Sequence, residues 1–536
     1  MSSASRPDTH FDMPDDHRRQ ILWADDEIDL LRPHIKFLEQ KGFAVTPVVS
    51  GEDALAALTR SRFDAVLLDE NMPGLGGLAT LDAIKSRDVS VPVILVTKNE
   101  EETLMEEAIG RHIRDYLTKP VNPSQVLLAL KRVLESSRIQ DTARTRDYVG
   151  DMQRWQELDR RRFTWAEWVD LAVEVARWDV LFDELPDEQG LAQAHQDFRR
   201  SLNSDFSRFI ETQYGPWVHG TAPRPPLSTD VVAQTVAPRL KRGERTALVV
   251  IDCLRLDQWL TLEPLLSEHF EIEREHYCSI LPTATPYSRN AIFSGLLPAE
   301  LYERHPDLWQ EISGDERSKN RFERQLLELQ LDRLKARPTR PIRYFKIYDA
   351  SEAQQARRQS SGFAGLGLVA LVYNFIDILS HGRSESELLQ ELAPDEAAFR
   401  SVMKAWFVHS PLYEILRILG QQGFAIVLTT DHGSVLARRA SKVHGNRDTS
   451  TNLRYKFGLN LNCDPKEAVI LRDPKLFKLP DDGVNKNYIL AREDYFFVYP
   501  TRFHEYERQF RGSFQHGGIS IEEMVLPRVT LTPRRP

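Results

Sequence analysis

The sequence predicts a multidomain α/β protein, in which a small doubly wound (βα)5 domain and a larger α/β domain flank a helical segment. Three observations support this prediction. Between residues 20 and 137, five short β-rich runs alternate with helical periodicity, which is typical of a parallel sheet covered by helices. From residue 138 the strand signal disappears. From about residue 238 onward, apolar runs with the composition of buried parallel strands return.

The composition is that of an ordinary globular protein and excludes several classes. The 536 residues fit about three or four domains. With 41% hydrophobic and 28% charged residues, the chain is not mainly disordered, collagen-like or coiled-coil. The 70 Lys and Arg residues and 79 Asp and Glu residues give a net charge of -9. This acidic balance, together with the lack of a visible helix-turn-helix, disfavours a DNA-binding regulator.

Cysteine content and apolar runs bear on the compartment. Cys253, Cys278 and Cys463 are too few for a disulfide framework and fit a reducing compartment. No apolar run reaches the ~18 residues of a membrane helix, so we expect no membrane insertion. Residues 1–19 are polar and lack the apolar core of a secretory signal. We therefore expect a disordered leader over 1–19 of a cytoplasmic protein.

The first domain is expected to span residues 20–137. Its five strands are predicted from ILWA (21–24), FAVTPV (43–48), DAVLLD (64–69), VPVILVT (91–97) and IRDYLTK (113–119). Periodic helices are expected between them, including 52–59 and 77–86.

The middle segment, 138–237, is predicted to be helical. Residues 138 to about 220 hold five of the nine tryptophans among charged residues at helical spacing, namely Trp155, Trp165, Trp168, Trp178 and Trp217. We interpret them as core residues. Thr164 and Glu167 have the spacing of a helix-starting capping box. A proline-rich stretch at 221–227 indicates a linker to the next domain.

The C-terminal domain, 238–536, is predicted to contain buried parallel strands at 246–252, 368–377 and 424–433. Each run ends in acidic or histidine residues, and ligands collect at the carboxyl ends of such strands. The polar, irregular segment 435–510 is expected to form an inserted cap or long loops.

Acidic residues follow the strands of the first domain. Asp25 and Asp26 follow the first strand, and Asp69 ends the third. Because the strand ends converge on one edge, we expect a pocket of three carboxylates, whose mutual repulsion favours a divalent cation such as Mg²⁺. Thr97, at the end of the fourth strand, would hydrogen-bond an incoming phosphoryl group, and Lys119, at the end of the fifth, would neutralise it.

These residues resemble the receiver domain of two-component response regulators. The resemblance covers 20–137 and rests on Asp25, Asp26, the motif LLDENMPGLGGL (67–78), Thr97 and Tyr116-x-x-Lys119-Pro120. It implies that Asp69 accepts a phosphoryl group from a sensor histidine kinase. The implied Mg²⁺ ligands are Asp25, Asp26, Asp69 and Asn71, and the implied switch residues are Thr97, Tyr116 and Lys119. The face formed by the fourth helix, fifth strand and fifth helix would form a homodimer on phosphorylation.

The C-terminal domain carries a second set of ligand-type residues. In chain order they are Asp252, Asp377, His381, Asp431, His432 and His516. Carboxylate and imidazole groups are what Zn²⁺ takes at catalytic sites. Three of each exceed the needs of one tetrahedral ion, so we expect two zinc ions, with Mn²⁺ as the alternative metal. Thr285, in a loop before a helix, offers a hydroxyl that could bind metal, lose its proton and attack phosphorus.

The order of these residues resembles the alkaline phosphatase superfamily, especially its nucleotide pyrophosphatase/phosphodiesterase branch. The resemblance implies that one zinc is held by Asp252, Thr285, Asp431 and His432, and the other by Asp377, His381 and His516. It implies Thr285 as the nucleophile, with Thr283 the less favoured choice, and a phosphothreonine intermediate. Asn290, with Arg289 as the second candidate, is implied to contact the phosphate.

Within the superfamily the resemblance narrows to PglZ-type domains. It rests on ALVVIDCLRLDQW (247–259), PTATPYSRNAIFSG (282–295), YNFIDILSH (373–381) and NLRYKFG (452–458). A receiver joined through a helical segment to such a domain resembles the PorX-like response regulators. That resemblance implies regulation of type IX secretion and hydrolysis of phosphodiesters in linear or cyclic oligonucleotides.

A basic segment, SKVHGNRDTSTNLRYK (441–456), could hold the second ester arm of a nucleotide or oligonucleotide. Its basic residues are Lys442, Arg447, Arg454 and Lys456, and the alternative interpretation is a solvated loop. Monoester, sulfate and phosphonate substrates remain open.

Two functions of different classes fit these patterns. The first is a phosphodiesterase controlled by phosphorylation of the receiver. The second is a regulatory binding protein, in which a metal-stabilised domain serves as a platform for a sigma factor or a secretion component. The intact ligand set favours the enzyme, because a platform has no need of an activated threonine. Zinc-dependent turnover of a chromogenic diester discriminates between the two.

Overall fold

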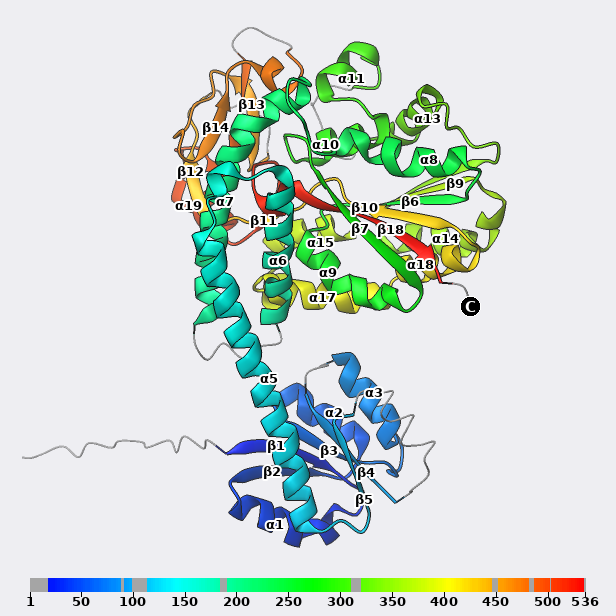
Figure 1. The fold of residues 1–536 in the computed structure, drawn as a ribbon, viewed down its shortest axis with the longest axis vertical. Coiled ribbons are helices and arrows are strands. Elements are labelled where there is room, and N and C mark those ends of the chain that lie inside the picture. Colours follow the sequence, from blue (N-terminus) through cyan, green and yellow to red (C-terminus); the bar gives the residue numbers. More distant parts are fainter. Residues whose placement is uncertain are drawn as a thin grey trace, which may run out of the picture. The chain divides into compact units, whose positions relative to one another are not determined.

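The computed structural model describes residues 18–87, 91–98, 113–183, 190–309, 320–445, 452–481, 486–501 and 503–534. The chain forms two compact units, Met1–Leu158 and Asp159–Pro536 (Figure 1). Most of the leader expected over 1–19 lies outside the described residues, and Arg19 already belongs to the first strand.

The first unit contains a five-stranded parallel sheet with the strand order β2-β1-β3-β4-β5. Its strands are β1 (Arg19–Ala24), β2 (Phe43–Val48), β3 (Ala65–Asp69), β4 (Val93–Thr97) and β5 (Asp115–Thr118). Alternate residues of each strand enter separate cores on the two faces. Helices α1 (Arg32–Gln40) and α5 (Pro123–Glu157) cover one face, and α2 (Gly51–Arg60) and α3 (Gly77–Arg87) cover the other. The predicted doubly wound fold is confirmed.

The predicted helical segment is distributed over both units. Helix α5 is 35 residues long and carries the chain from the parallel sheet to the end of the first unit. Helices α6 (Trp165–Phe182) and α7 (Leu191–Val218) belong to the second unit. The capping box predicted at Thr164 and Glu167 starts α6, with both reciprocal hydrogen bonds present. Among the tryptophans, Trp155, Trp168, Trp178 and Trp217 are buried, as expected for core residues.

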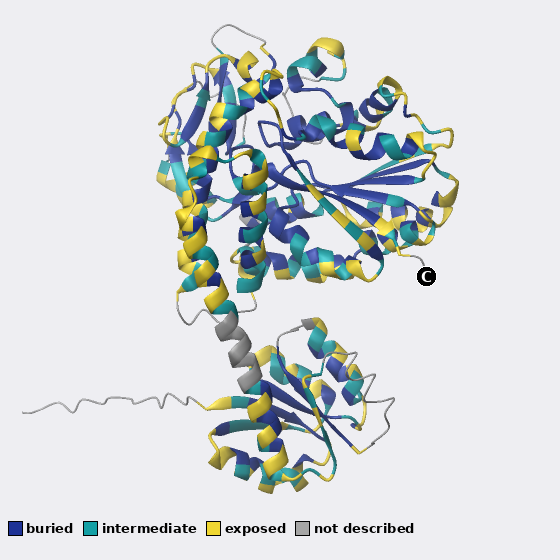
Figure 2. Cartoon of the chain, in the orientation of Figure 1, coloured by how far each residue is buried: buried dark blue, intermediate teal, exposed yellow. Residues whose placement is uncertain are grey.

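The second unit is built around a six-stranded mixed sheet with the order β7-β18-β10-β6-β9-β8. Strands β10, β6, β9 and β8 are parallel, whereas β18 runs antiparallel to both β10 and β7. The strands are β6 (Thr246–Ile251), β7 (Phe270–Cys278), β8 (Ile342–Ile347), β9 (Leu368–Tyr373), β10 (Ala425–Thr429) and β18 (Val525–Pro533). Figure 2 shows the central strands buried between layers of helices.

Helices cover both faces of this sheet. On one face lie α9 (Leu256–Ser267), α14 (Ala350–Gln359), α15 (Phe375–Glu385), α17 (Glu396–Val408) and α18 (Pro411–Gln421). On the other lie α8 (Ala237–Lys241), α10 (Thr285–Ser294), α11 (Pro298–Arg304) and α13 (Glu323–Arg333). The short helices are α16 (Glu387–Leu392), α19 (Phe503–Phe510) and α20 (Ile521–Met524).

Two details differ from the sequence-based expectations. The strand expected over 368–377 ends at Tyr373, and the chain turns into α15, so Asp377 lies on a helix. The segment 435–510, expected to be irregular, forms short strands around a small apolar core of its own. These are β11 (Val435–Leu436), β12 (Arg439–Lys442), β13 (Tyr455–Leu459), β14 (Ala468–Leu471), β15 (Lys486–Ala491) and β16 (Tyr495–Val498), while β17 (Phe514–Gln515) pairs with β11. Among the described residues, no helix has the length and apolarity needed to span a bilayer.

Candidate metal centres

The first candidate centre lies at the carboxyl ends of β1 and β3. One carboxylate oxygen from each of Asp25, Asp26 and Asp69 lies within 4.8 Å of the others. Asp25 and Asp69 are buried and Asp26 is exposed. The Lys119 Nζ, just after β5, lies 2.9 Å from Asp25 Oδ2 and 3.1 Å from Asp69 Oδ2. The structure therefore brings together the three carboxylates and the lysine selected from the sequence.

The electrostatics of this pocket suit a small hard cation. Burial raises the pKa of Asp69 to about 6, Lys119 opposes the shift, and the neighbouring Asp25 adds to it. Since a divalent ion would relieve the charge repulsion, and carboxylate oxygens are the ligands that Mg²⁺ prefers, the residues fit Mg²⁺. The exposed Asp26 leaves one side open to water. Asn71, two residues after Asp69, is also exposed.

The expected switch residues lie around the pocket in different environments. Thr97 ends β4, and its hydroxyl donates a hydrogen bond to the carboxylate of Glu70. Tyr116, in β5, is 39% exposed. Residues 99–112, which would contain the fourth helix of the expected dimer face, lie outside the described residues.

The raised pKa predicts a pH-dependent stability of the first unit in the absence of Mg²⁺. Because Asp69 titrates near 6 when folded and near 3.8 in its reference state, its burial destabilises the fold fully above pH 6 and not at all below pH 4. As the pH rises from 4 to 6, the free energy of unfolding of the wild type should therefore fall, relative to that of Asp69→Asn, by on the order of 3 kcal/mol. Hydrogen exchange of β3 amides at pH 4 to 7 measures this. A difference between the two proteins that does not vary with pH would contradict the interpretation.

The second unit holds two further ligand clusters. In the first, Asp252 follows β6, and Asp431 and His432 follow β10, with one ligand atom from each within 4.8 Å of the others. All three are buried. The Nε2 of His432 lies 3.6 Å from Asp252 Oδ1 and 3.7 Å from Asp431 Oδ2. Thr285, the first residue of α10, places its Oγ1 2.9 Å from His432 Nε2.

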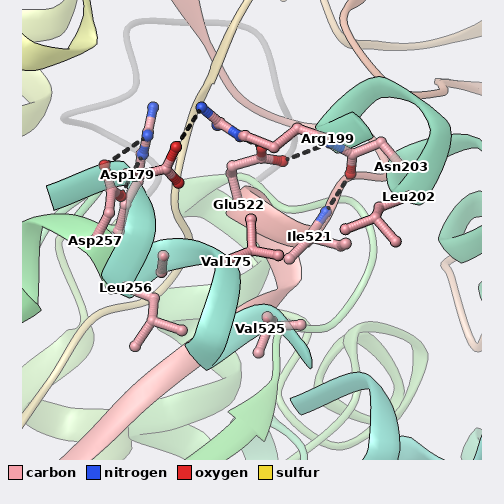
Figure 3. Close-up of a pocket in the computed structure, with 13 residues that line it drawn as sticks. Val175, Asp179, Arg199, Leu202, Asn203, Leu256, Asp257, Ile521, Glu522 and Val525 are labelled. Carbon is pink, nitrogen blue, oxygen red and sulfur yellow. Dashed lines mark hydrogen bonds and ion pairs between the residues drawn. The ribbon is translucent and has the colours of Figure 1, made fainter. Parts of the chain in front are cut away.

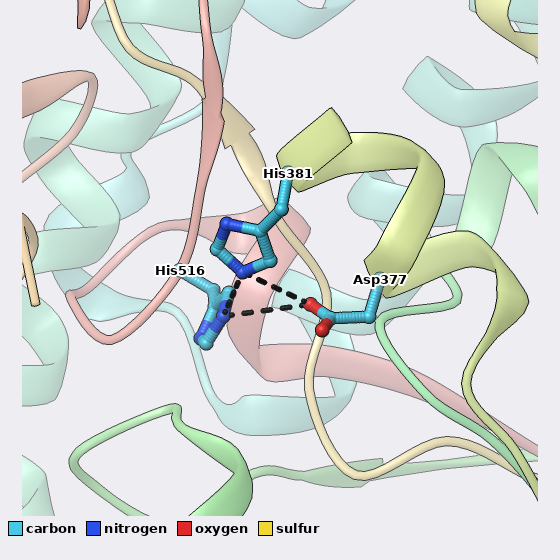
Figure 4. Close-up of side chains that lie close together, drawn as sticks. All are labelled: Asp377, His381 and His516. Carbon is cyan, nitrogen blue, oxygen red and sulfur yellow. Dashed lines mark hydrogen bonds and ion pairs between the residues drawn. The ribbon is translucent and has the colours of Figure 1, made fainter. Parts of the chain in front are cut away.

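The other cluster comprises Asp377 and His381, one turn apart on α15, and His516, which follows β17 (Figure 4). Asp377 Oδ1 lies 3.4 Å from His381 Nε2 and 3.6 Å from His516 Nε2. The side chain of His381 is 42% exposed, so this cluster opens to solvent. The rings of His432 and His516 stack with their centroids 4.1 Å apart, which makes the two clusters adjacent. All six ligand candidates and Thr285 therefore meet in one region.

Burial sets the protonation of these groups. It raises the pKa of Asp252 well above the usual range, against the effect of Arg289, and it raises that of Asp431. The pKa of Asp377 is lowered: burial opposes the shift, but His381 and then His516 favour its ionised form. Burial lowers the pKa of His432, which keeps a neutral imidazole with a lone pair in the centre.

The donor set fits metal ions. Of the described residues, none donates a hydrogen bond to the buried Asp252 Oδ1, and the buried Asp431 Oδ2 has no hydrogen bond and faces Arg289 Nε at 3.4 Å. Buried acceptors without donors are costly unless a cation satisfies them. Mixed carboxylate and imidazole donors are typical of zinc. The residues of both clusters can therefore hold the two zinc ions expected from the sequence.

The candidate phosphate contacts are placed around these ligands. Arg289 is buried on α10 and forms ion pairs with Asp252 at 2.9 Å, Glu323 at 3.1 Å and Asp431 at 3.4 Å. Its guanidinium thus neutralises the ligand carboxylates from within the protein. Asn290 is also buried: its amide donates to the carbonyl of Pro286, and its oxygen accepts from Asn320.

The basic residues of 441–456 do not form one surface. Arg454 is fully buried and forms an ion pair with Glu523, so its guanidinium is engaged inside the fold. Lys456 is buried, its Nζ donates to the carbonyl of Asn452 at 3.0 Å, and burial lowers its pKa to about 8. Lys442 lies exposed on β12, and Arg447 lies outside the described residues. Of the described basic residues of this segment, Arg454 and Lys456 are therefore buried in the fold, and Lys442 alone lies exposed.

Sequence reasoning missed Glu323, Asn374 and Glu523, which support the centre, and it considered Thr283 only as the less favoured nucleophile. Glu323 and Asn374 hold Arg289, and no local pattern marks them. Thr283 bonds to the loop after His516: its hydroxyl donates to the carbonyl of Gly518 and accepts from the N–H of Gly517. Glu523 could have been noticed, because Ser520 and Glu523 have capping-box spacing and Ser520 does cap α20.

Comparison with known proteins defines the class. Residues 21–131 match the response regulator receiver domain, and residues 231–531, more than half of the chain, match the BREX system PglZ alkaline phosphatase-like domain. The protein therefore joins a response regulator receiver domain to an alkaline-phosphatase-like domain. The chain belongs to the PglZ family. A receiver domain implies phosphorylation by a sensor kinase and binds Mg²⁺, and alkaline-phosphatase-like domains use metal ions.

Individual relatives match the receiver portion. The sensory transduction protein RegX3 of Mycolicibacterium smegmatis is 34% identical over 131 residues, which are 24% of this chain and 56% of that protein. The transcriptional regulatory protein ResD of Bacillus subtilis is 30% identical over 122 residues, 23% of this chain and 50% of that protein. The chain thus spans about half the length of the curated relatives it matches. Among solved structures, the receiver domain of NtrX from Brucella abortus is 31% identical, with 22% of this chain and 98% of that chain covered and a TM-score of 0.21.

Proposed function

We propose that the protein is a two-component response regulator in which phosphorylation of Asp69 controls a two-zinc phosphodiesterase acting on nucleotides or oligonucleotides. The observation that carries the enzymatic part is the meeting of two ligand clusters at the His432–His516 stack, with the Thr285 hydroxyl 2.9 Å from His432. A platform for a binding partner would not require a hydroxyl at this position. We extend the proposal to a PorX-like role in type IX secretion, with a sigma factor or secretion component as partner, on the resemblance alone.

The arrangement of side chains suggests how a phosphodiester would react. Thr285 begins α10, so its hydroxyl lies at the positive end of a helix dipole, where a phosphate is favoured. When bound, the two zinc ions would stabilise negative charge on the attacking and leaving oxygens. The Thr285 hydroxyl would lose its proton, which the leaving alkoxide regains through solvent, and its Oγ would attack phosphorus in line to give a phosphothreonine as the P–O bond to the leaving alcohol breaks. The alcohol would leave on the side of Asp377, His381 and His516. This side is open to solvent, because the side chain of His381 is partly exposed. Water would then hydrolyse the phosphothreonine, release the phosphomonoester and restore the hydroxyl.

The remaining residues keep the reacting groups in place. Arg289 offsets part of the charge of Asp252 and Asp431, and bound metal ions would supply the remaining positive charge that favours the ionised carboxylates in this buried position. The side chains of the Asp252 cluster are buried, and electrostatic interactions are stronger in such a low-dielectric environment. Turnover of bis(p-nitrophenyl) phosphate by the zinc-loaded chain, and its loss after chelation, tests the proposal. Equal rates with and without metal would overturn it.

The phosphorylation step makes a separate prediction. With acetyl phosphate and Mg²⁺, we expect the wild-type chain to gain the mass of one phosphoryl group, and Asp69→Asn to gain none, because Asp69 is the acceptor that the receiver-domain motif implies and it lies 3.1 Å from Lys119. Intact-mass spectrometry measures this. The control is Asp64→Asn, which removes a carboxylate of the same unit that pairs with Arg19 outside the pocket.

We expect beryllofluoride with Mg²⁺ to convert the wild-type chain to a dimer and to leave Asp69→Asn unchanged. Light scattering measures the change. A single mass with and without beryllofluoride would exclude the dimer step, whereas phosphorylation of Asp69→Asn would exclude Asp69 as the acceptor.

A further inference from the structure

Helix α7 presents one polar stripe to the loops of the metal centre. Arg199, Asn203, Ser207 and Tyr214 are spaced by four, four and seven residues, which places them on one face of the helix. Asn203, Ser207 and Tyr214 are buried. Helix α7 lies outside the ranges 21–131 and 231–531 that match known domains. The two matched domains therefore assign no role to the residues of α7.

The first part of the stripe contacts residues 519–522. Arg199 Nη2 donates to Glu522 Oε1 at 2.7 Å, and Asn203 Nδ2 donates to Glu522 Oε2 at 2.9 Å (Figure 3). Asn203 Oδ1 also accepts from the backbone N–H of Ile521 at 2.7 Å. One turn further on, the Ser207 hydroxyl donates to the carbonyl of Ile519. Both carboxylate oxygens of Glu522 and two backbone groups are thus held by α7.

Residues 519–522 lie between His516 and Glu523, and Glu523 bonds back to the metal centre. The Glu523 carboxylate accepts from the N–H of Gly518 at 2.9 Å and from Thr283 Oγ1 at 3.4 Å. The Thr283 carbonyl lies 3.3 Å from His516 Nδ1, which directs Nε2 of the same ring towards His381 and Asp377. Displacement of Glu522 would therefore shift the residues that orient His516.

The same segment also abuts the other cluster. A Cβ at Gly433, the residue after His432, would lie 1.9 Å from the carbonyl oxygen of Glu522. The N–H of Gly433 donates to the carbonyl of Glu523. At the far end of the stripe, the Tyr214 hydroxyl accepts from the N–H of Leu281 at 2.9 Å, in the loop that leads to Thr285. Helix α7 therefore contacts segments next to both clusters and the nucleophile.

We propose that α7 braces the dinuclear centre, and that Arg199 and Asn203 are positioning residues that set the orientation of His516 through Glu522 and Glu523. This inference rests on the proposed function, because it assumes that His516 holds a metal ion. It adds residues that neither touch the ions nor belong to the matched family range.

The charges around Arg199 give a reason to expect that its substitution disturbs Glu522. Arg199 also pairs with Asp179 at 3.1 Å and with Glu396 at 2.9 Å, and Arg255 pairs with the same Glu396 at 2.6 Å. Loss of Arg199 would leave three carboxylates with one fewer cation in a region of low exposure. Glu522 would then move towards water, and the segment bonded to it would follow.

The test compares variants of the full chain loaded with Zn²⁺. Arg199→Gln and Asn203→Leu should weaken binding of the zinc ion held by Asp377, His381 and His516. We expect a loss of affinity of roughly 10- to 100-fold in a chelator competition, the range found for residues that orient metal ligands. Arg199→Lys should recover part of the affinity, because the charge remains. The kcat for bis(p-nitrophenyl) phosphate should fall in parallel at nearly constant KM.

The matched control is Arg400→Gln. Arg400 belongs to the same charge network, and its side chain is less exposed than that of Arg199 (5% against 12%). It pairs with Asp183 at 2.6 Å and Asp257 at 2.7 Å and forms no hydrogen bond or ion pair with the described residues 519–523. We expect it to lower the unfolding temperature while zinc affinity stays within about twofold of wild type. If Arg199→Gln fails to fold, Asn203→Leu, which removes no charge, decides the question.

Each outcome decides the inference separately from the proposed function. If Asn203→Leu bound both zinc ions with wild-type affinity, the proposed role of α7 in positioning His516 would be overturned. Equal loss of affinity in Arg400→Gln would also overturn it, since a general loss of stability would then account for the effect. If the wild-type chain binds two zinc ions but cleaves no diester, the proposed function fails while the affinity comparison still tests the brace. A wild-type chain that binds no zinc would overturn both.

Discussion

Thr285→Ala is expected to reduce kcat for bis(p-nitrophenyl) phosphate by on the order of 10³-fold or more. The hydroxyl is the proposed nucleophile, lies 2.9 Å from His432 and begins a helix whose positive end favours a phosphate. The Thr283 hydroxyl, the other candidate nucleophile, is bonded to Gly517 and Gly518, so we do not expect it to take the place of Thr285. Steady-state kinetics of the zinc-loaded chain measure the change.

Two controls make this result specific. Thr285→Ser keeps a hydroxyl at the helix start and should retain a substantial part of the activity. Zinc content should be measured in parallel, so that loss of the nucleophile is separated from loss of metal. A Thr285→Ala chain with wild-type activity and two bound zinc ions would remove Thr285 from the mechanism.

Removal of His516 is expected to have the second large effect. His516→Ala and Asp377→Asn should each lower the zinc content from about two ions per chain to about one, because the Asp252, Asp431 and His432 cluster is buried and has its own ligands. Activity should fall at least ~10²-fold, since only one ion would remain to stabilise charge on the reacting oxygens. Elemental analysis after gel filtration, paired with kinetics, measures both.

His276→Gln is the matched control for this prediction. His276 is a half-buried histidine of the same unit, on β7 and outside both clusters, and burial lowers its pKa to about 4. Its replacement should leave two zinc ions in place. Loss of zinc from His276→Gln would show that buried histidines in this unit affect metal binding through stability, and the assignment of His516 as a ligand would lose its support.

The sequence predicted those parts of the fold that depend on local pattern. Each strand of the first unit was marked by a short apolar run, and the rule that ligands gather at carboxyl strand ends located Asp25, Asp69, Asp252 and Asp431. Asp377 was predicted at a strand end but lies on α15, because an apolar run followed by more apolar residues does not reveal where a strand gives way to a helix. The spacing of Asp377 and His381 nevertheless suited one helical turn.

Long-range polar contacts were beyond the reach of local pattern. Arg199 and Glu522 are 323 residues apart, and Arg289 meets Glu323 and Asn374 only because the sheet brings α10, α13 and β9 together. The strands of 435–510 are short and carry polar residues on many positions, so their small apolar core gave no recognisable periodicity. Arg454 illustrates the result: its charge suggested a surface role, and its burial against Glu523 gives it a structural one.

The boundary between the two units has a practical meaning for anyone who wishes to study the hydrolase alone. A fragment trimmed to residues 231–531 would keep every ligand side chain, yet it would lack Arg199, Asn203, Ser207 and Tyr214. A fragment that begins at Asp159, where the second unit starts, would retain them. We expect the shorter fragment to be inactive because it lacks the α7 residues that position the metal ligands, although it keeps the ligands themselves.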